Sequence, residues 1–224
     1  MTPELAHVES WIFDLDNSLY PHSCNLFELI DVRMGAYIQR LLGVDAVEAR
    51  RVQKGFFHAH GTTLAGLMAN HGVDPHDFLD FVHDIDLARI AADPKLVAAL
   101  DRLPGRKFVF TNGDEKYARR VLERLGLANA FDGLHDIHAM AYVPKPDPRS
   151  YAAMCERYAI APERALFVED MARNLAPAKA LGMTTVWIDN GSEQAGVVAD
   201  PAFIDYRIAD IGQWLEEMAG ERVE

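Results

Sequence analysis

The chain has 224 residues, of which 50% are hydrophobic and 25% charged, the balance of an ordinary globular protein with one sizeable core. Its formal net charge of -12 argues against a nucleic-acid polymer or an anionic membrane as partner, because clustered Lys and Arg provide most phosphate-backbone binding. No stretch reaches the roughly 18 to 20 apolar residues that span a bilayer, and the first residues lack a basic patch before an apolar run. We therefore expect a cytoplasmic protein whose two cysteines, Cys24 and Cys155, are free thiols.

The predicted elements begin with a buried strand over residues 11–15, a short run of apolar and aromatic side chains. From about residue 21 to residue 90 the pattern predicts helices only, and these cover residues 26–42, 47–57, 63–71 and 75–83. Asp74 is the expected cap of the last one. Four aromatic residues at helix-packing spacings are interpreted as the core of this block: Phe56, Phe57, Phe78 and Phe81.

Beyond residue 90, short β-type runs alternate with helical stretches. Helices are predicted over residues 94–103 and 115–125 and from about residue 174 to just before Gly182. The predicted strands cover residues 107–110, 165–168 and 184–188. Such alternation predicts an α/β fold, a Rossmann-like parallel sheet with helices on both faces. Residues 1–20 and 91–224 form the expected core, and residues 21–90 form an inserted helical cap above the first strand.

Polar side chains follow the predicted strands at the points where a parallel sheet binds its ligands. Asp14 lies at the end of the first predicted strand and Asp16 follows that strand, and the alternation of an extended chain places both on the same side. Two crowded carboxylates cost free energy unless a cation lies between them. Glu169 and Asp170 follow a later strand, and an oxygen-only set of ligands suits Mg²⁺.

Two further segments are ambiguous when taken alone. Thr111, Asn112 and Gly113 lie where a strand turns into a helix, so they either hold phosphate oxygens or simply cap the helix. Lys145 lies between Pro144 and Pro146, which stiffen the backbone, and it is either a fixed cation of a site or a surface lysine.

In order and spacing, these segments resemble the four motifs of the haloacid dehalogenase-like hydrolase superfamily. The motifs match residues 14–19, residues 111–113, Lys145, and Glu169 with Asp170. The helical insertion resembles the α-helical cap of that superfamily, and four strings are similar to its pyrimidine 5'-nucleotidase-like branch: residues 16–22, 61–64, 83–87 and 110–113. One departure is Asn17-Ser18 in place of the usual Gly-Thr, although Ser18 keeps the hydroxyl.

The resemblance implies a magnesium-dependent phosphatase in which Asp14 attacks phosphorus and forms an aspartyl phosphate. Asp16 would protonate the leaving alkoxide and then deprotonate the attacking water. Mg²⁺ would be bound by the Asp14 carboxylate, the Asp16 backbone carbonyl and Asp170, with Glu169 assisting directly or through water. Lys145 and Thr111 would complete the electrostatic cradle. The remaining contacts to the phosphate would come from Asn17, Ser18, Asn112 and Gly113.

The expected substrate is a small phosphate monoester, and the branch resemblance favours a pyrimidine nucleoside monophosphate such as UMP or CMP. Alternatives are a sugar phosphate or phosphoglycolate, a non-catalytic phosphate-binding module and, more weakly, a 2-haloacid. Halide leaves without a proton, whereas Asp16 supplies one. Substrate choice must come from the cap, where four residues could contact a sugar or base, or could instead cap helices or lie on the surface: His22, Asn25, Thr62 and Thr63. The sequence leaves the oligomeric state open.

Overall fold

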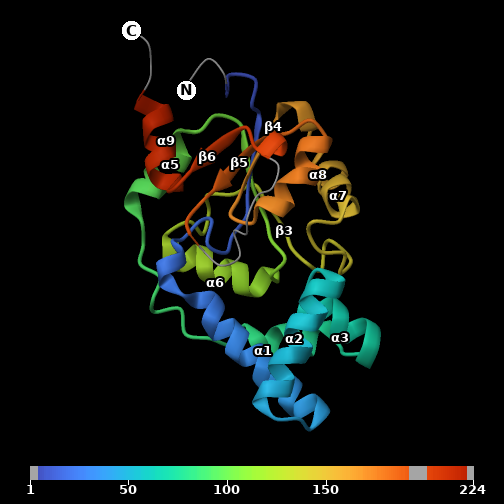
Figure 1. The fold of residues 1–224 in the computed structure, drawn as a ribbon. Helices are drawn as coiled ribbons and strands as arrows, with labels where there is room; N and C mark the ends of the chain where they lie inside the picture. The colour runs from blue at the N-terminus through green and yellow to red at the C-terminus, as the bar shows by residue number, and fades with distance from the viewer. Residues whose placement is uncertain (1–4, 192–200, 221–224) are drawn as a thin grey trace.

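A six-stranded parallel sheet forms the centre of the computed structural model, which describes residues 5–191 and 201–220 (Figure 1). The strand order is β3-β2-β1-β4-β5-β6. The strands are β1 (Ser10–Phe13), β2 (Arg106–Phe110), β3 (Gly133–His135), β4 (Ala165–Glu169), β5 (Thr184–Ile188) and β6 (Tyr206–Ile208). The predicted Rossmann-like α/β fold is therefore confirmed.

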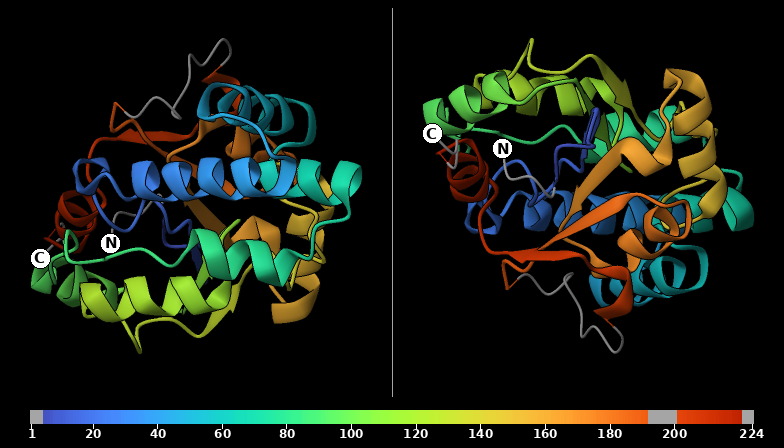
Figure 2. Two further views of the ribbon diagram at one scale, coloured as in Figure 1. Left: turned by 90° about the horizontal axis from the view of Figure 1, so that it is seen from below. Right: turned by 90° about the horizontal axis from the view of Figure 1, so that it is seen from above.

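Helices cover both faces of the sheet, as the two views along the vertical axis show (Figure 2). α5 packs against α9, and α7 packs against α8, on opposite sides of the strands (Figure 1). The α-helices are α1 (Leu26–Leu42), α2 (Ala46–His60), α3 (Thr63–His71), α4 (Pro75–Val82), α5 (Pro94–Arg102), α6 (Glu115–Leu125), α7 (Pro148–Tyr158), α8 (Leu175–Ala180) and α9 (Ile211–Gly220). Short 3-10 turns are His22–Cys24, Pro162–Arg164, Ala172–Asn174 and Pro201–Phe203.

β1 lies between β2 and β4 and is buried along its whole length. Trp11, Ile12 and Phe13 are each 0% exposed, as expected for a strand covered by helices on both faces. Ser10 is in register with Arg106 on one side and with Ala165 on the other. The strand order reverses at β1, so a crevice is expected at the carboxyl ends of β1, β2 and β4.

Two edge strands, β3 and β6, were not predicted from the sequence. Each has three residues, too few to show the alternation by which strands are recognised. The four longer strands form within a residue or two of their predicted ends.

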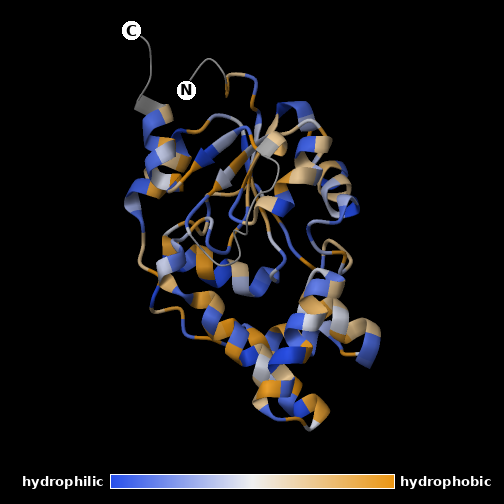
Figure 3. Cartoon of the chain, viewed as in Figure 1, coloured by the Kyte–Doolittle hydropathy of each residue, from blue (hydrophilic) through white to orange (hydrophobic). Residues whose placement is uncertain are grey.

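Helices α1 to α4 lie together beyond the carboxyl edge of the sheet (Figure 1). Hydrophobic and hydrophilic residues alternate along them, as in amphipathic helices that pack on one face (Figure 3). Tyr37 contacts Phe78 and Phe81 edge to face, with ring centroids 5.1 and 5.5 Å away. Asp74 caps α4 as predicted, since its side chain accepts a hydrogen bond from the His76 N–H. No helix in the described ranges has the length and apolar character needed to cross a bilayer.

Candidate active site

Lys145 is the centre of the polar cluster at the carboxyl edge of the sheet. Its ammonium donates hydrogen bonds to Asp14 Oδ1 at 2.7 Å, to Glu169 Oε2 at 2.7 Å and to the Phe110 carbonyl at 2.8 Å. The residue is 1% exposed, so it is not the surface lysine that the alternative interpretation allowed. Three strand ends, those of β1, β2 and β4, therefore meet on one buried cation.

Asn112 holds the backbone of Lys145 in place. Its side-chain oxygen accepts from the Lys145 N–H at 2.8 Å, and its amide donates to the Lys145 carbonyl at 3.1 Å. The Asn112 side chain thus fixes the lysine loop through its carbonyl oxygen and one N–H.

Three carboxylates converge beside Lys145. Asp14, Glu169 and Asp170 are all buried, and each offers an oxygen within 4.8 Å of the others. Burial above all, and then the charge of Glu169, raise the pKa of Asp14 to about 7 although Lys145 opposes the change. Burial, followed by the charges of Glu169 and Asp14, raises the pKa of Asp170 to about 10. So much crowded negative charge, presented only by oxygen atoms, fits a hard divalent cation.

The Glu169 side chain accepts hydrogen bonds from three donors of the protein. Oε2 accepts from Lys145 and from the Asn174 amide at 3.0 Å, and Oε1 accepts from the Met171 N–H at 3.1 Å. We therefore assign Glu169 to holding Lys145 in place beside the carboxylates of Asp14 and Asp170.

Asp16 points its carboxylate at two tyrosines that the sequence analysis did not single out. Oδ1 accepts hydrogen bonds from the Tyr20 hydroxyl at 2.6 Å and from the Tyr117 hydroxyl at 2.8 Å. Burial first, and then the charge of Asp16, raise the pKa of both phenols well above 10. Both tyrosines consequently stay protonated and donate to Asp16.

His83 and Asp114 support one of these tyrosines. The imidazole of His83 stacks on the Tyr117 ring with centroids 4.4 Å apart, and its Nδ1 hydrogen-bonds Asp114 Oδ2. Asp114 Oδ1 also caps α6 by accepting from the Tyr117 N–H at 2.9 Å. Tyr117 lies at an apolar position of an amphipathic helix, so its pattern indicated core packing and gave no sign of this role.

Of the residues predicted to bind phosphate, Ser18 contacts Asp14 directly. Ser18 donates its hydroxyl to Asp14 Oδ2 at 3.1 Å, and Thr111 Oγ1 accepts from the Gly113 N–H at 2.9 Å. Asn17 adopts φ 59°, and its carbonyl accepts from the Asn190 amide at 2.9 Å. The first two motifs lie at the same edge of the sheet because β1 and β2 are paired, with Phe13 in register with Val109.

The four residues proposed for substrate choice have mainly local contacts. Thr62 caps α3 by accepting from the Ala65 N–H at 3.1 Å, and the Thr63 hydroxyl donates to the Gln53 carbonyl at 3.4 Å. Asn25 precedes α1 without capping it through its side chain, which donates to Glu28 instead. His22 is half-buried in a 3-10 turn. Among the described residues, none of these hydrogen bonds joins them to the Asp14 cluster.

Phe57 was interpreted as core of the helical block, and the structure corrects this. The guanidinium carbon of Arg173 lies 4.7 Å from the centre of its ring, whereas Phe56, Phe78 and Phe81 do pack with the hydrophobic core. Arg173 follows Asp170 by three residues, and a Cβ on Gly61 would lie 3.8 Å from Pro144 Cγ. The helical block thus touches the loops that carry Asp170 and Lys145.

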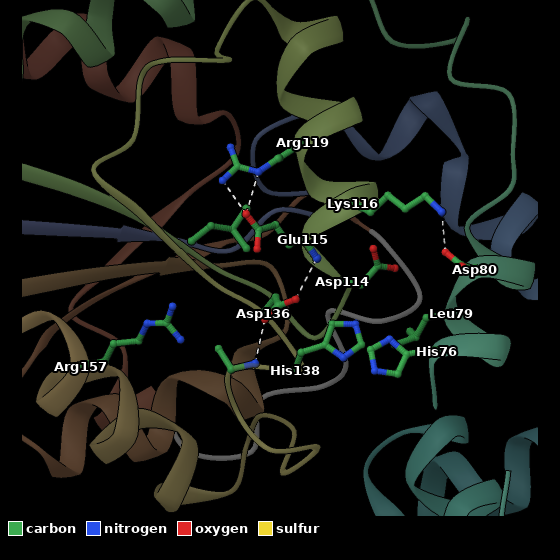
Figure 4. Close-up of a pocket in the computed structure, with 12 residues that line it drawn as sticks. His76, Leu79, Asp80, Asp114, Glu115, Lys116, Arg119, Asp136, His138 and Arg157 are labelled. Carbon is green, nitrogen blue, oxygen red and sulfur yellow. Dashed lines mark hydrogen bonds and ion pairs between the residues drawn. The ribbon is translucent and has the colours of Figure 1, made fainter. Parts of the chain in front are cut away.

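A cavity of about 730 Å³ opens beside this region, between α4, the start of α6 and the loop after β3 (Figure 4). His76 of α4 and His138 of the loop stack there, with ring centroids 4.5 Å apart. The cavity reaches Asp114 but none of the acids around Lys145 line it. The cavity is therefore distinct from the buried acidic cluster, which is the candidate active site.

Residues 11–182 match the family described as haloacid dehalogenase-like hydrolase. The match covers most of the chain and every motif residue from Asp14 to Asp170, so the chain belongs to this family.

Among curated proteins, the chain is 28% identical over 191 residues to phosphate metabolism protein 8 of Saccharomyces cerevisiae, covering 77% of this chain and 59% of that protein. It is 31% identical over 158 residues to a phosphoglycolate phosphatase of Rhodospirillum rubrum, covering 68% of this chain and 60% of that protein. These matches thus span less than two thirds of the length of each relative.

Among solved structures, a haloacid dehalogenase-type phosphatase of Thermococcus onnurineus superposes with a TM-score of 0.63 at 21% identity, covering 96% of this chain and 100% of its own. An L-2-haloacid dehalogenase of Xanthobacter autotrophicus, with chloropropionic acid covalently bound, gives a TM-score of 0.57 at 17% identity and covers 96% and 99%. At these identities the two structures share the fold alone with this chain.

Proposed function

We propose that this protein is a magnesium-dependent phosphatase that hydrolyses small phosphate monoesters through an aspartyl phosphate on Asp14. The main observation in support is the buried ion pair between Lys145 and Asp14, which are 2.7 Å apart and lie beside Glu169 and Asp170. A buried cation at this place can stabilise the charge that a transferring phosphoryl group develops. The family match and the similarity to curated phosphatases agree with this chemistry.

Each residue of the cluster has a part in the proposed reaction. Asp14 forms the bond to phosphorus, and Asp16 passes a proton to the leaving alkoxide and later takes one from water. Mg²⁺, when bound, neutralises phosphate charge so that an anionic nucleophile can approach, and Asp14, Asp170 and the Asp16 carbonyl are its proposed ligands. Ser18, Thr111 and the N–H groups near Gly113 are the proposed phosphate contacts.

Helices α1 to α4 are the proposed cap, corresponding to residues 21–90 between the two parts of the core, 1–20 and 91–224. Support comes from the way these helices pack on one another and from their contacts with the core at Phe57 and Gly61. A cap in this place would determine which leaving group reaches the phosphoryl site.

The proposed substrate is a pyrimidine nucleoside monophosphate such as UMP or CMP, which the branch-specific strings favour. A phosphoglycolate or sugar-phosphate phosphatase is the second candidate, and the similarity to the phosphoglycolate phosphatase of Rhodospirillum rubrum favours it. A dehalogenase is disfavoured by Asp16, since a halide needs no proton.

The test is a phosphate-release assay over nucleotides, phosphoglycolate and sugar phosphates, with and without Mg²⁺. We expect Mg²⁺-dependent release that Asp14→Asn abolishes and that the control Asp101→Asn, on the exposed face of α5, leaves unchanged. Preference for UMP and CMP supports the nucleotidase, whereas preference for phosphoglycolate supports the second candidate. Tight phosphate binding without turnover would contradict an enzymatic role, and full activity of Asp14→Asn would contradict the mechanism.

A further inference from the structure

The carboxylate of Asp16 is held on one oxygen only. Tyr20 and Tyr117 both donate to Oδ1, and within the described part of the chain Oδ2 accepts no hydrogen bond. The tyrosines are 2% and 1% exposed, so each hydroxyl is withdrawn from bulk water and its bond to Asp16 is not readily exchanged for one to solvent. This arrangement distinguishes the two oxygens of a group that is proposed to carry a proton.

The two tyrosines come from different parts of the chain. Tyr20 lies on the segment that leaves β1 for α1, and Tyr117 lies on α6 of the core. The segment that returns from α4 begins at His83, which stacks on Tyr117 and hydrogen-bonds Asp114. Arg120 of α6 secures this segment by donating to the His83 carbonyl at 2.9 Å. Both connections between the helical block and the core therefore contact the groups that hold Asp16.

We propose that Tyr20 and Tyr117 are positioning residues that anchor Oδ1 of Asp16, so that the proton used in the proposed phosphatase reaction is carried on Oδ2. Neutral phenols donate to Oδ1 whether Asp16 is ionised or protonated, because a carboxyl oxygen accepts two hydrogen bonds in either form. Oδ2 is left as the atom that gains and loses the proton. His83 extends this anchorage to the helical block by fixing the ring of Tyr117.

The proton balance follows from that assignment. In the first displacement the Asp14–phosphorus bond forms, the bond from phosphorus to the leaving oxygen breaks, and the proton of Oδ2 passes to that oxygen. In the second, water oxygen bonds to phosphorus, the Asp14–phosphorus bond breaks, and the water proton returns to Oδ2. Asp16 thus ends each cycle as it began.

The experiment compares two kinds of leaving group in Tyr20→Phe, Tyr117→Phe and the double variant. With an alkyl phosphate such as glycerol phosphate, we expect kcat to fall about 10-fold per hydroxyl removed, because part of the general acid contribution is lost. KM should change less than about twofold. With p-nitrophenyl phosphate, whose phenolate leaves without a proton, the first turnover should keep its rate while the later steady state slows. A burst of p-nitrophenol should therefore appear.

Tyr158→Phe is the control, since its part-buried hydroxyl donates to the Leu134 carbonyl at 2.8 Å, on the β3 side of the sheet. It should lose a similar amount of stability and show no burst. An equal fall in the rates of the first turnover and of the steady state in the Tyr20→Phe and Tyr117→Phe variants would overturn the proposal, as would wild-type kinetics.

The variant Asp16→Asn distinguishes failure of the positioning role from failure of the proposed function. If it accumulates phosphorylated protein while the tyrosine variants act as wild type, only the positioning role fails. If Asp16→Asn turns over normally, or the wild type releases no phosphate, the proposed function fails and the positioning role fails with it.

Discussion

The ion pair between Lys145 and Asp14 is almost completely withdrawn from water, with the two side chains 1% and 7% exposed and 2.7 Å apart. Burial alone lowers the pKa of Lys145, but the charges of Asp14 and Glu169 outweigh it and raise the pKa above its usual value. The lysine therefore stays charged, and its charge acts in a medium that screens it little.

Replacing Lys145 by Met should stop the reaction and weaken the fold. The substitution leaves Asp14 and Glu169 buried without their common partner, so we expect a loss of about 3 kcal/mol in the free energy of unfolding. Phosphate release should fall about 1000-fold, because a donor to the developing charge is removed. Urea unfolding and steady-state assays measure the two effects, with Lys95→Met on the exposed side of α5 as the control. Activity within tenfold of wild type would contradict the assigned role.

Asp170 and Glu169 should respond differently to neutral substitution. Asp170→Asn removes a proposed ligand charge, so we expect its affinity for Mg²⁺ to fall by at least about 10-fold. Glu169→Gln weakens the contact with Lys145 instead, and it should lower kcat at saturating Mg²⁺ with a smaller effect on affinity. A thermal-shift titration with Mg²⁺ measures the affinity for the cation independently of catalytic activity. A larger affinity loss in Glu169→Gln than in Asp170→Asn would reverse our assignment.

The sequence predicted that three of the four motifs lie together, because each of these three lies at or just after the end of a predicted strand and parallel strands bring their carboxyl ends together. The position of Asp170 followed from that rule, whereas Lys145 lies well beyond the end of β3, a strand that was not predicted, and its place in the site was implied by the family resemblance. The contact between Tyr117 and His83 did not follow from the sequence. It joins the apolar face of α6 to the segment after α4, so it depends on how α6 and α4 pack. The opposite error concerned Phe57, whose helical spacing predicts burial although the ring meets Arg173.

The metal-free protein should lose stability as the pH rises. Asp14 and Asp170 have pKa values raised from 3.8 to about 7 and about 10, chiefly by burial and then by neighbouring acids. A raised carboxyl pKa stabilises the fold fully below the unfolded value near 4, and that stability is lost as the pH passes through 7 and toward 10. Bound Mg²⁺ should offset the loss, so the increase in Tm on adding Mg²⁺ should be larger at pH 8 than at pH 6.

Differential scanning fluorimetry in EDTA and in Mg²⁺ at both pH values makes this comparison. Asp170→Asn should show a smaller difference between the two pH values, since one of the raised groups is gone. If Mg²⁺ increases Tm by the same amount at pH 6 and pH 8, Asp14 and Asp170 do not bind the cation as proposed.

Asp114 should contribute stability through His83 as well as through capping. It accepts from the Tyr117 N–H at 2.9 Å and from His83 Nδ1. Burial raises the pKa of Asp114, but the hydrogen bond and charge of His83 outweigh burial and lower it overall. Stability from a lowered carboxyl pKa is present above the unfolded value near 4 and is lost as the pH falls through the folded value.

Asp114→Asn tests this contribution because Asn is as good an N-cap as Asp, so the capping bond is kept and the charged partner of His83 is lost. We expect a loss of about 2 kcal/mol at pH 7, the usual range for a hydrogen bond to a charged group, and a smaller loss at pH 3. Asp45→Asn is the matched control, since Asp45 caps α2 by accepting from the Glu48 N–H at 2.9 Å without a histidine partner. Urea unfolding at the two pH values measures both variants. Equal losses in the free energy of unfolding in Asp114→Asn and Asp45→Asn would mean that His83 adds no stability beyond the cap. In that case the contact between His83 and Asp114 would not stabilise the packing of the segment after α4 on α6.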